Sequence, residues 1–208
     1  MSWAELKLYL GDDFRPGWLP GGARLRNETI RRKGLKHYLR QSEERLYVEM
    51  SRELNGLREP YFQCVRETSP LCEVLEYQCG IGSDGIQLTI MGYPSAFAGE
   101  SGRCMDFLKW RIEQRGLDAR IYSLKNPPRF PLVVCLTTLD RIPSVERLAE
   151  LGEIVALGVG PTVPGTPVDL AEYIAKGNYE IVKEATFNVI WHFIAFRTPE
   201  KQEEIDNG

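Results

Sequence analysis

The residues best suited to chemistry lie in one stretch, where an apolar pair and an acid precede a glycine turn. Val74 and Leu75 form the apolar pair, Glu76 closes it, and Gly80 and Gly82 alternate in the turn that follows. Glycines allow backbone N–H groups and the N-terminus of a following helix to come close to a ligand. The spacing therefore indicates a turn that binds a nucleotide-type cofactor.

Alternating strands and helices are predicted around this turn. The segment 187–196 is apolar on both faces and follows its predecessor closely, which indicates a hairpin whose last strand lies inside the sheet. Such alternation is typical of a doubly wound α/β domain. The predicted strands span 74–76, 96–98, 119–122, 132–136, 153–159, 179–185 and 187–196, and the helices nearest the turn span 84–91 and 102–115.

Three segments resemble one protein family. Residues 74–83 resemble motif I of the class I S-adenosylmethionine-dependent methyltransferases, an apolar pair, an acid and alternating glycines. Residues 130–143 are similar to that family's fourth strand and the turn after it, and residues 103–111 to the helix after its second strand. The resemblance implies a Rossmann-like, mostly parallel seven-stranded sheet with an antiparallel C-terminal strand. We expect an N-terminal arm with helices over 1–69, the methyltransferase-like domain over 70–197 and a polar tail over 198–208.

The same resemblance implies S-adenosylmethionine as the cofactor. In small members of the family the N-terminal helices often cover the cofactor and shape the acceptor pocket, although aromatic residues at helical spacing also suit plain packing. The cofactor positions carry over to Glu76, Gln78, Gly80, Gly82, Gly99, Glu100, Ser123, Leu124, Leu136 and Thr137. The candidates for substrate contacts are His37, Tyr38, Tyr47, Tyr61 and, on a rim loop rich in proline and glycine, Thr162.

Four positions depart from the family's pattern. Gln78 replaces the first glycine of motif I, while Gly99, Ser123 and Pro131 stand where the family usually has acids. Because a hydrogen bond to a charged group contributes about 1.5–3 kcal/mol, losing two would weaken cofactor binding by roughly two to four decades. Glu100, one position after Gly99, is the candidate replacement at the ribose. The sequence predicts that Gln78→Gly combined with Gly99→Asp raises affinity for S-adenosylmethionine.

Two functions of different class follow. The first is transfer of a methyl group to a small molecule or peptide, which depends mainly on positioning and requires no assigned catalytic residue. The second is a catalytically degenerate domain, a pseudoenzyme that no longer binds cofactor and serves as a binding or scaffolding subunit for a peptide or partner enzyme. Residues 80–85 also fit the GxGxxG pattern of nicotinamide-binding turns, with Glu100 as the later acid. The match at strand four favours the methyltransferase.

Composition narrows the partners and the compartment. A net charge of -3 argues against general nucleic-acid binding, although residues 24–40 are strongly basic and form either a solvated face or a phosphate- or acid-binding patch. Five cysteines without a CxxC pair indicate reduced thiols and a cytoplasmic location, and two histidines do not suffice for a typical metal site. The longest uncharged apolar stretch is too short to span a membrane. Aromatic residues over 3–18 must dock on their own domain or on a second subunit, which makes a homodimer through this arm one alternative.

Overall fold

The structure, a computed structural model, describes residues 3–18, 22–54, 58–138, 144–160, 174, 177, 179–187 and 191–198. The chain forms two compact units. The first unit comprises Met1–Phe62 and Leu75–Pro127, and the second comprises Gln63–Val74 and Pro128–Gly208. None of the helices described in these ranges is long and apolar enough to cross a membrane.

Seven strands form one sheet, in the order β3-β2-β1-β4-β5-β7-β6. Their bounds are β1 (Val74–Tyr77), β2 (Ser95–Gly99), β3 (Arg120–Ser123), β4 (Phe130–Thr138), β5 (Gly152–Gly160), β6 (Glu180–Phe187) and β7 (Trp191–Arg197). β2 and β3 pair in parallel, as do β4 and β5, whereas β7 runs antiparallel to both β5 and β6. The predicted doubly wound, mostly parallel sheet with one antiparallel C-terminal strand is therefore confirmed. The interior position of β7 is also confirmed: its residues Phe193 to Phe196 are buried, as expected for a strand with neighbours on both sides.

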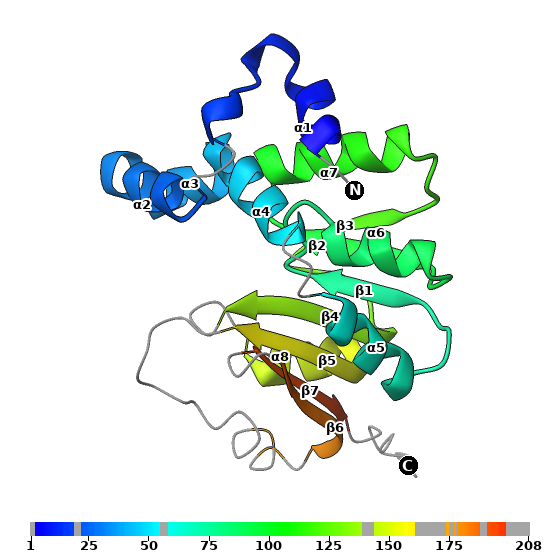
Figure 1. The fold of residues 1–208 in the computed structure, drawn as a ribbon. Helices are drawn as coiled ribbons and strands as arrows, with labels where there is room; N and C mark the ends of the chain where they lie inside the picture. Colours follow the sequence, from blue (N-terminus) through cyan, green and yellow to red (C-terminus); the bar gives the residue numbers. More distant parts are fainter. Residues whose placement is uncertain are drawn as a thin grey trace, which may run out of the picture. The chain divides into compact units, whose positions relative to one another are not determined.

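In the first unit, an apolar cluster lies between strand β2 and helices α6 and α7. Phe97 of β2, Ile86 of α6 and Leu108 of α7 are fully buried in it. Burial of such side chains stabilises the unit by about 1.5–3 kcal/mol each. Figure 1 shows α6 and α7 in green beside the strands they cover. The elements are α1 (Trp3–Leu10), η1 (Gly11–Asp13), η2 (Pro16–Trp18), α2 (Gly22–Lys33), α3 (Leu35–Gln41), α4 (Glu44–Leu54), β1 (Val74–Tyr77), α6 (Ser83–Ile90), β2 (Ser95–Gly99), α7 (Arg103–Gln114) and β3 (Arg120–Ser123).

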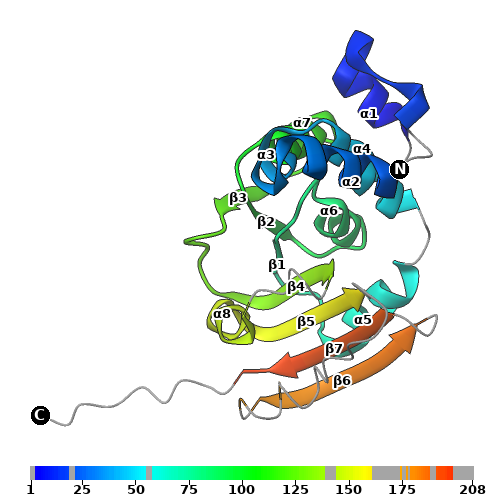
Figure 2. The same cartoon turned by 90° about the vertical axis from the view of Figure 1, so that its left-hand side faces the viewer.

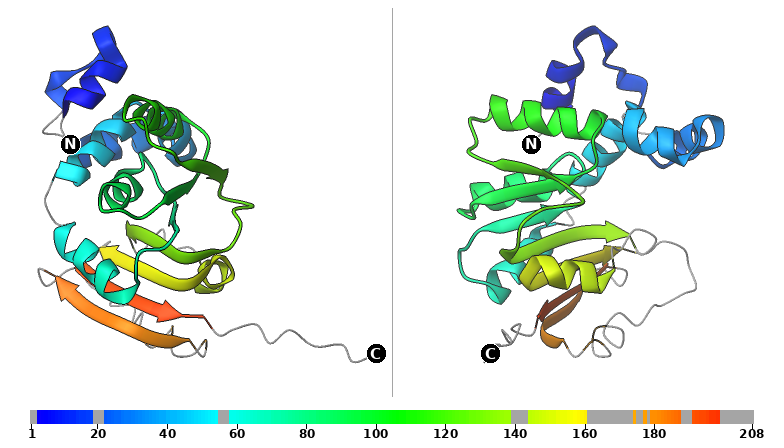
Figure 3. Two further views of the ribbon diagram at one scale, coloured as in Figure 1. Left: turned by 90° about the vertical axis from the view of Figure 1, so that its right-hand side faces the viewer. Right: turned by 180° about the vertical axis from the view of Figure 1, so that it is seen from behind.

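The N-terminal arm packs on the first unit itself. Tyr47 of α4 is 1% exposed, and the rings of Trp3, Phe14 and Trp18 surround it at centroid distances of 6.4, 5.9 and 5.3 Å. Figure 3 shows α1, in dark blue, beside α7 when the molecule is seen from behind. Of the two sites predicted for the arm, its own domain and a second subunit, the structure shows the first.

The basic segment forms two helices instead of one. Gly34 has φ 83°, a left-handed conformation that ends α2 at Lys33 and lets α3 begin at Leu35 in a new direction. Helix propensity gives the energetic cost of a glycine inside a helix but not the change in chain direction that its backbone allows.

The second unit contains the remaining strands, and Figure 2 shows them side by side as a curved sheet. The side chains of Leu132 to Cys135 are fully buried, as expected for a strand with neighbours on both sides. Ser144 caps α8 by accepting a hydrogen bond from the Arg147 N–H at 3.1 Å. The elements are β4 (Phe130–Thr138), α8 (Val145–Leu151), β5 (Gly152–Gly160), β6 (Glu180–Phe187) and β7 (Trp191–Arg197), and α5 (Glu59–Thr68) crosses the boundary between the units.

Candidate cofactor site

The glycine turn of the first unit joins β1 to α6. Gly80 has φ 54° and Gly82 has φ 74°, both in the left-handed region that glycine adopts without strain. A Cβ on Gly82 would also lie 2.2 Å from the Leu108 side chain. The predicted turn is therefore present, and Gly82 is required by both its backbone conformation and the space around it.

Gln78 also adopts the left-handed conformation, with φ 59°, and is the one residue other than glycine that does so among those described. Its side chain is exposed. A residue with a Cβ is strained by about 1–2 kcal/mol in this region. The position that carries a glycine in the motif I pattern thus has a backbone conformation that favours glycine.

The Glu76 carboxylate reaches past the turn to the beginning of α6. It is 4% exposed, and its Oε2 accepts a hydrogen bond from the Gly85 N–H at 2.8 Å. Burial and the neighbouring Asp84 charge raise the pKa of Glu76 well above its ordinary value. The acid of motif I therefore occupies the N-terminus of α6, a position where the helix dipole favours negative charge.

Two ion pairs flank the turn, and both involve residues for which the sequence indicates no role. Arg58 contacts the buried Asp84 carboxylate at 2.7 Å. On α4, the Arg45 guanidinium lies 3.6 Å from Glu49, and a Cβ on Gly80 would lie 3.9 Å from the Glu49 side chain. The charge spacing within helices is visible in the sequence, but contact with a turn that lies about thirty residues later is not.

The end of β2 differs from the pattern on which the ribose prediction depends. A Cβ on Gly99 would lie 2.5 Å from Cε of Met105 and 2.9 Å from Sγ of Cys79, so position 99 faces the apolar cluster. Glu100 is exposed and lies 3.9 Å from Arg40 of α3. Of these two neighbouring positions, only Glu100 carries a carboxylate accessible to a ligand.

The other cofactor candidates lie at strand ends. Ser123 is exposed and pairs with Gly99 in register, while the Leu124 carbonyl accepts a hydrogen bond from the Tyr77 hydroxyl at 3.3 Å. Leu136, half-buried, and Thr137 belong to β4 of the second unit. The structure brings Glu76, Gln78, Gly80 and Gly82 together in one turn, and β2 and β3 bring Gly99 and Ser123 side by side.

The substrate candidates lie in different surroundings. Tyr38 of α3 and Tyr61 of α5 are buried, Tyr61 against Phe62 at a centroid distance of 5.6 Å, and His37 is half-buried. The Tyr47 hydroxyl accepts a hydrogen bond from the Arg15 N–H at 2.6 Å inside the aromatic cluster. Thr162 lies outside the described residues. The predicted role of each in binding a methyl acceptor stays a prediction.

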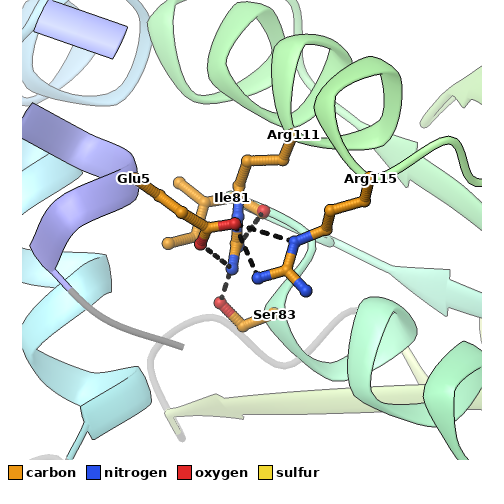
Figure 4. Close-up of polar contacts among 5 residues, drawn as sticks. All are labelled: Glu5, Ile81, Ser83, Arg111 and Arg115. Atoms are coloured by element: carbon orange, nitrogen blue, oxygen red, sulfur yellow. Dashed lines mark hydrogen bonds and ion pairs between the residues drawn. The ribbon is translucent and has the colours of Figure 1, made fainter. Parts of the chain in front are cut away.

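A buried cation lies behind the turn. Arg111 of α7 donates hydrogen bonds to the Ile81 carbonyl at 2.8 Å and to the Ser83 hydroxyl at 3.4 Å. Figure 4 shows this guanidinium between the turn and Glu5 of α1. Across the described ranges, no three His, Cys, Asp or Glu side chains are grouped as metal ligands would be.

Comparison with known proteins gives structural matches only. No protein-family model matches the chain, and no curated protein is similar to it in sequence.

Several solved structures share its fold at low identity. TehB from Haemophilus influenzae aligns with a TM-score of 0.55 and 14% identity over 74% of this chain and 66% of TehB. The magnesium protoporphyrin IX methyltransferase ChlM from Synechocystis PCC 6803, with bound SAM, aligns with a TM-score of 0.58 and 14% identity over 86% of this chain and 97% of ChlM. The Pyrococcus abyssi tRNA (uracil-54, C5)-methyltransferase, in complex with S-adenosyl-L-homocysteine, aligns with a TM-score of 0.51 and 16% identity over 66% of this chain and 38% of the enzyme. At such identities the likeness concerns the fold alone. The chain therefore has the fold of the class I S-adenosylmethionine-dependent methyltransferases.

Proposed function

We propose that the chain binds S-adenosylmethionine and transfers its methyl group to a small molecule or peptide. One observation carries the proposal: the Glu76 carboxylate occupies the N-terminus of α6, where it accepts the Gly85 N–H at 2.8 Å. A dinucleotide cofactor places its pyrophosphate on such N–H groups. Because the Glu76 carboxylate already accepts from the N-terminus of α6, the turn is unsuited to a pyrophosphate there and suits a ligand with a positive charge beside the turn.

The residues around the turn fit such a ligand. Glu76, Asp84 and Glu49 bring carboxylates to its two sides, and the ion pairs with Arg58 and Arg45 hold the last two in place. S-adenosylmethionine, when bound, supplies a methyl group on a positively charged sulfonium. In this proposal Gly80 and Gly82 admit its methionine part, and Glu100 accepts hydrogen bonds from its ribose, a role supported by the exposure of that carboxylate at the end of β2.

A calorimetric titration tests the proposal directly. S-adenosylmethionine, S-adenosylhomocysteine and NADH are each titrated into the purified protein up to millimolar concentrations. We expect binding of the two adenosyl ligands and none of NADH. At a pH above the raised pKa of Glu76, where its carboxylate is ionised, Glu76→Gln should weaken the binding of S-adenosylmethionine more than that of S-adenosylhomocysteine. Only S-adenosylmethionine carries the sulfonium charge, and the substitution removes the opposing charge with little change of shape. Binding of NADH alone would overturn the proposal.

A second candidate function is a binding or scaffolding subunit without cofactor. It is favoured by Gly99, where the Met105 methyl and the Cys79 thiol fill the space that a ribose-binding acid would enter. In this alternative, an acidic partner peptide would bind at the corner between α2 and α3. There, Arg31, Arg32 and Lys36 are exposed beside Leu35, which is 51% exposed. No binding of either adenosyl ligand at millimolar concentration would support this second function.

The proposal for partners follows from the same surfaces. We propose a small-molecule or peptide substrate, or one partner protein, and no general binding of nucleic acid, because the net charge of -3 gives no long-range attraction to a polyanion.

A homodimer through the N-terminal arm requires arm surface that is not already packed on the arm's own unit. The arm's rings over 3–18 already pack on their own unit, and Leu8, 70% exposed, is the apolar side chain of α1 that a second copy could cover. Light scattering of the wild type and of Leu8→Ser distinguishes a homodimer through this surface from a monomer.

A further inference from the structure

Arg111 is a fully buried cation directly behind the glycine turn. Its side chain has no exposed surface, and one of its nitrogens donates to the Ile81 carbonyl at 2.8 Å and to the Ser83 hydroxyl at 3.4 Å. These two groups flank Gly82, whose own N–H donates to the Cys79 carbonyl at 2.7 Å. One guanidinium thus contacts the backbone on one side of Gly82 and a side chain on the other.

The charge of Arg111 is balanced by Glu5, on α1. The Glu5 carboxylate lies 3.2 Å from Arg111, and it also accepts a hydrogen bond from Nε of Arg115 at 2.8 Å. Figure 4 shows this carboxylate between the two guanidinium groups. Leaving a buried charge without its partner costs about 3–5 kcal/mol. The placement of Arg111 against the turn therefore depends on α1 being docked.

The two glycines of the turn have no side chain that could hold its backbone in one conformation. Gly80 and Gly82 both have positive φ, and glycine loses more conformational entropy on ordering than other residues do. Ordering one residue costs about 1–2 kcal/mol. If contacts order the turn before a ligand arrives, the free energy of ordering no longer lowers the affinity for that ligand.

We propose that Arg111 is a positioning residue for the glycine turn, and that Glu5 on α1 holds Arg111 in place. Docking of the N-terminal helix thereby sets the order of the turn and, through it, the affinity for cofactor. The statement about affinity rests on the proposed function, whereas the statement about the order of the turn does not.

Three variants test this in the full-length chain. Arg111→Lys keeps the charge, but a single ammonium group cannot reproduce the planar fork that reaches Ile81 and Glu5 together. Glu5→Gln removes the opposing charge without contacting the turn. Arg115→Gln is the matched control, because it also removes an ion pair with Glu5. Arg115 directly follows the last residue of α7 and has no hydrogen bond with the turn among the described residues. Glu5→Asp, which retains the charge on a shorter side chain, replaces Glu5→Gln if that variant does not fold.

Amide hydrogen exchange, measured without cofactor, reports on the turn. We expect exchange of the Gly82 amide to rise about tenfold or more in Arg111→Lys and Glu5→Gln, relative to buried amides of β4 in the same sample, and to be unchanged in Arg115→Gln. The affinity for S-adenosylhomocysteine should fall about tenfold in the first two variants only.

Two results would overturn the inference. One is unchanged exchange at Gly82 in folded Arg111→Lys and Glu5→Gln, and the other is an equal rise in Arg115→Gln, which would mean that the network acts only on stability. If the wild type binds no adenosyl ligand, the proposed function fails. The exchange measurement still decides the role of Arg111.

Discussion

The Glu76 carboxylate accepts a hydrogen bond from the Gly85 N–H at 2.8 Å, across the turn between β1 and α6. Desolvation is the main reason that the pKa of Glu76 is raised well above its ordinary value of 4.5, and the charge of Asp84 adds to it. The hydrogen bond from Gly85 acts in the opposite direction but is outweighed. The acid of the motif is therefore held in place by the helix it caps and is easily protonated.

The stability of the protein should fall as pH rises through the window between 4.5 and the raised pKa of Glu76. Within this window the folded chain holds a proton that the unfolded chain has released, so the unfolding free energy decreases by up to about 1.4 kcal/mol per pH unit. Glu76→Gln removes this dependence, so its unfolding free energy should differ from that of the wild type by a constant amount below pH 4.5 and by an amount that changes as pH rises above 4.5. Denaturant unfolding between about pH 3.5 and 8 provides the measurement. Parallel curves across the whole range would show that Glu76 titrates normally.

Gln78 should be a source of strain that a glycine removes. At φ 59° a Cβ costs about 1–2 kcal/mol, partly offset by the 0.5–1 kcal/mol of chain entropy that glycine loses on folding. Gln78→Gly should therefore raise the unfolding free energy by about 0.5–1 kcal/mol. Gln78→Ala, which removes the same side chain but keeps the Cβ, should leave it nearly unchanged. Equal stabilisation by both variants would assign the effect to the side chain and contradict the argument from the backbone.

The sequence predicts the parts of this site that are local in the chain. The turn, the acid before it and the helix after it follow from adjacent residues, and the strain at Gln78 follows from one glycine missing at a fixed spacing. The sequence does not reveal Arg111 or Glu5, because their contacts join residues 30 and 106 positions apart. One arginine among several basic residues of an amphipathic helix gives no sign that it points inward, so only the packed structure identifies Arg111.

At position 99 the family pattern predicts the wrong effect of a substitution. From the sequence, restoring an acid at position 99 alongside Gln78→Gly should recover binding at the ribose. In the structure, position 99 faces the apolar cluster, since strand residues alternate between faces and Phe97, two positions earlier, lies in the same cluster. The family pattern aligns position 99 correctly, but it does not reveal that the Met105 and Cys79 side chains occupy the space next to it.

Gly99→Asp should therefore destabilise the protein instead of improving the site. A carboxylate there would displace the Met105 methyl and sit against the Cys79 thiol, and burying it without a partner costs about 2–4 kcal/mol. Gly99→Ala separates the cost of displacing the Met105 methyl from the cost of burying a carboxylate. Because the Met105 side chain can move away from a methyl group, Gly99→Ala should lower the unfolding free energy by only about 1 kcal/mol. Thermal unfolding of both variants measures the difference. A folded Gly99→Asp protein with undiminished stability and tighter S-adenosylmethionine binding would show that the side chain leaves the cluster for the ligand.

The thiols should differ sharply in reactivity, although all five cysteines are free. Burial raises the pKa of Cys104 to about 12 and that of Cys79 well above 9.0, so neither forms an appreciable thiolate at pH 8. Cys64 and Cys135 are also buried, whereas Cys72 is only half-buried, with its sulfur 3.4 Å from the Ser69 hydroxyl. Ellman's reagent should therefore modify one thiol rapidly in the native protein and five after unfolding in guanidinium. Cys72→Ser should abolish the rapid phase and leave four thiols in the unfolded chain. A rapid phase that persists in this variant would place a second cysteine at the surface, and the same variant carrying Cys79→Ser would show whether the glycine turn opens to expose it.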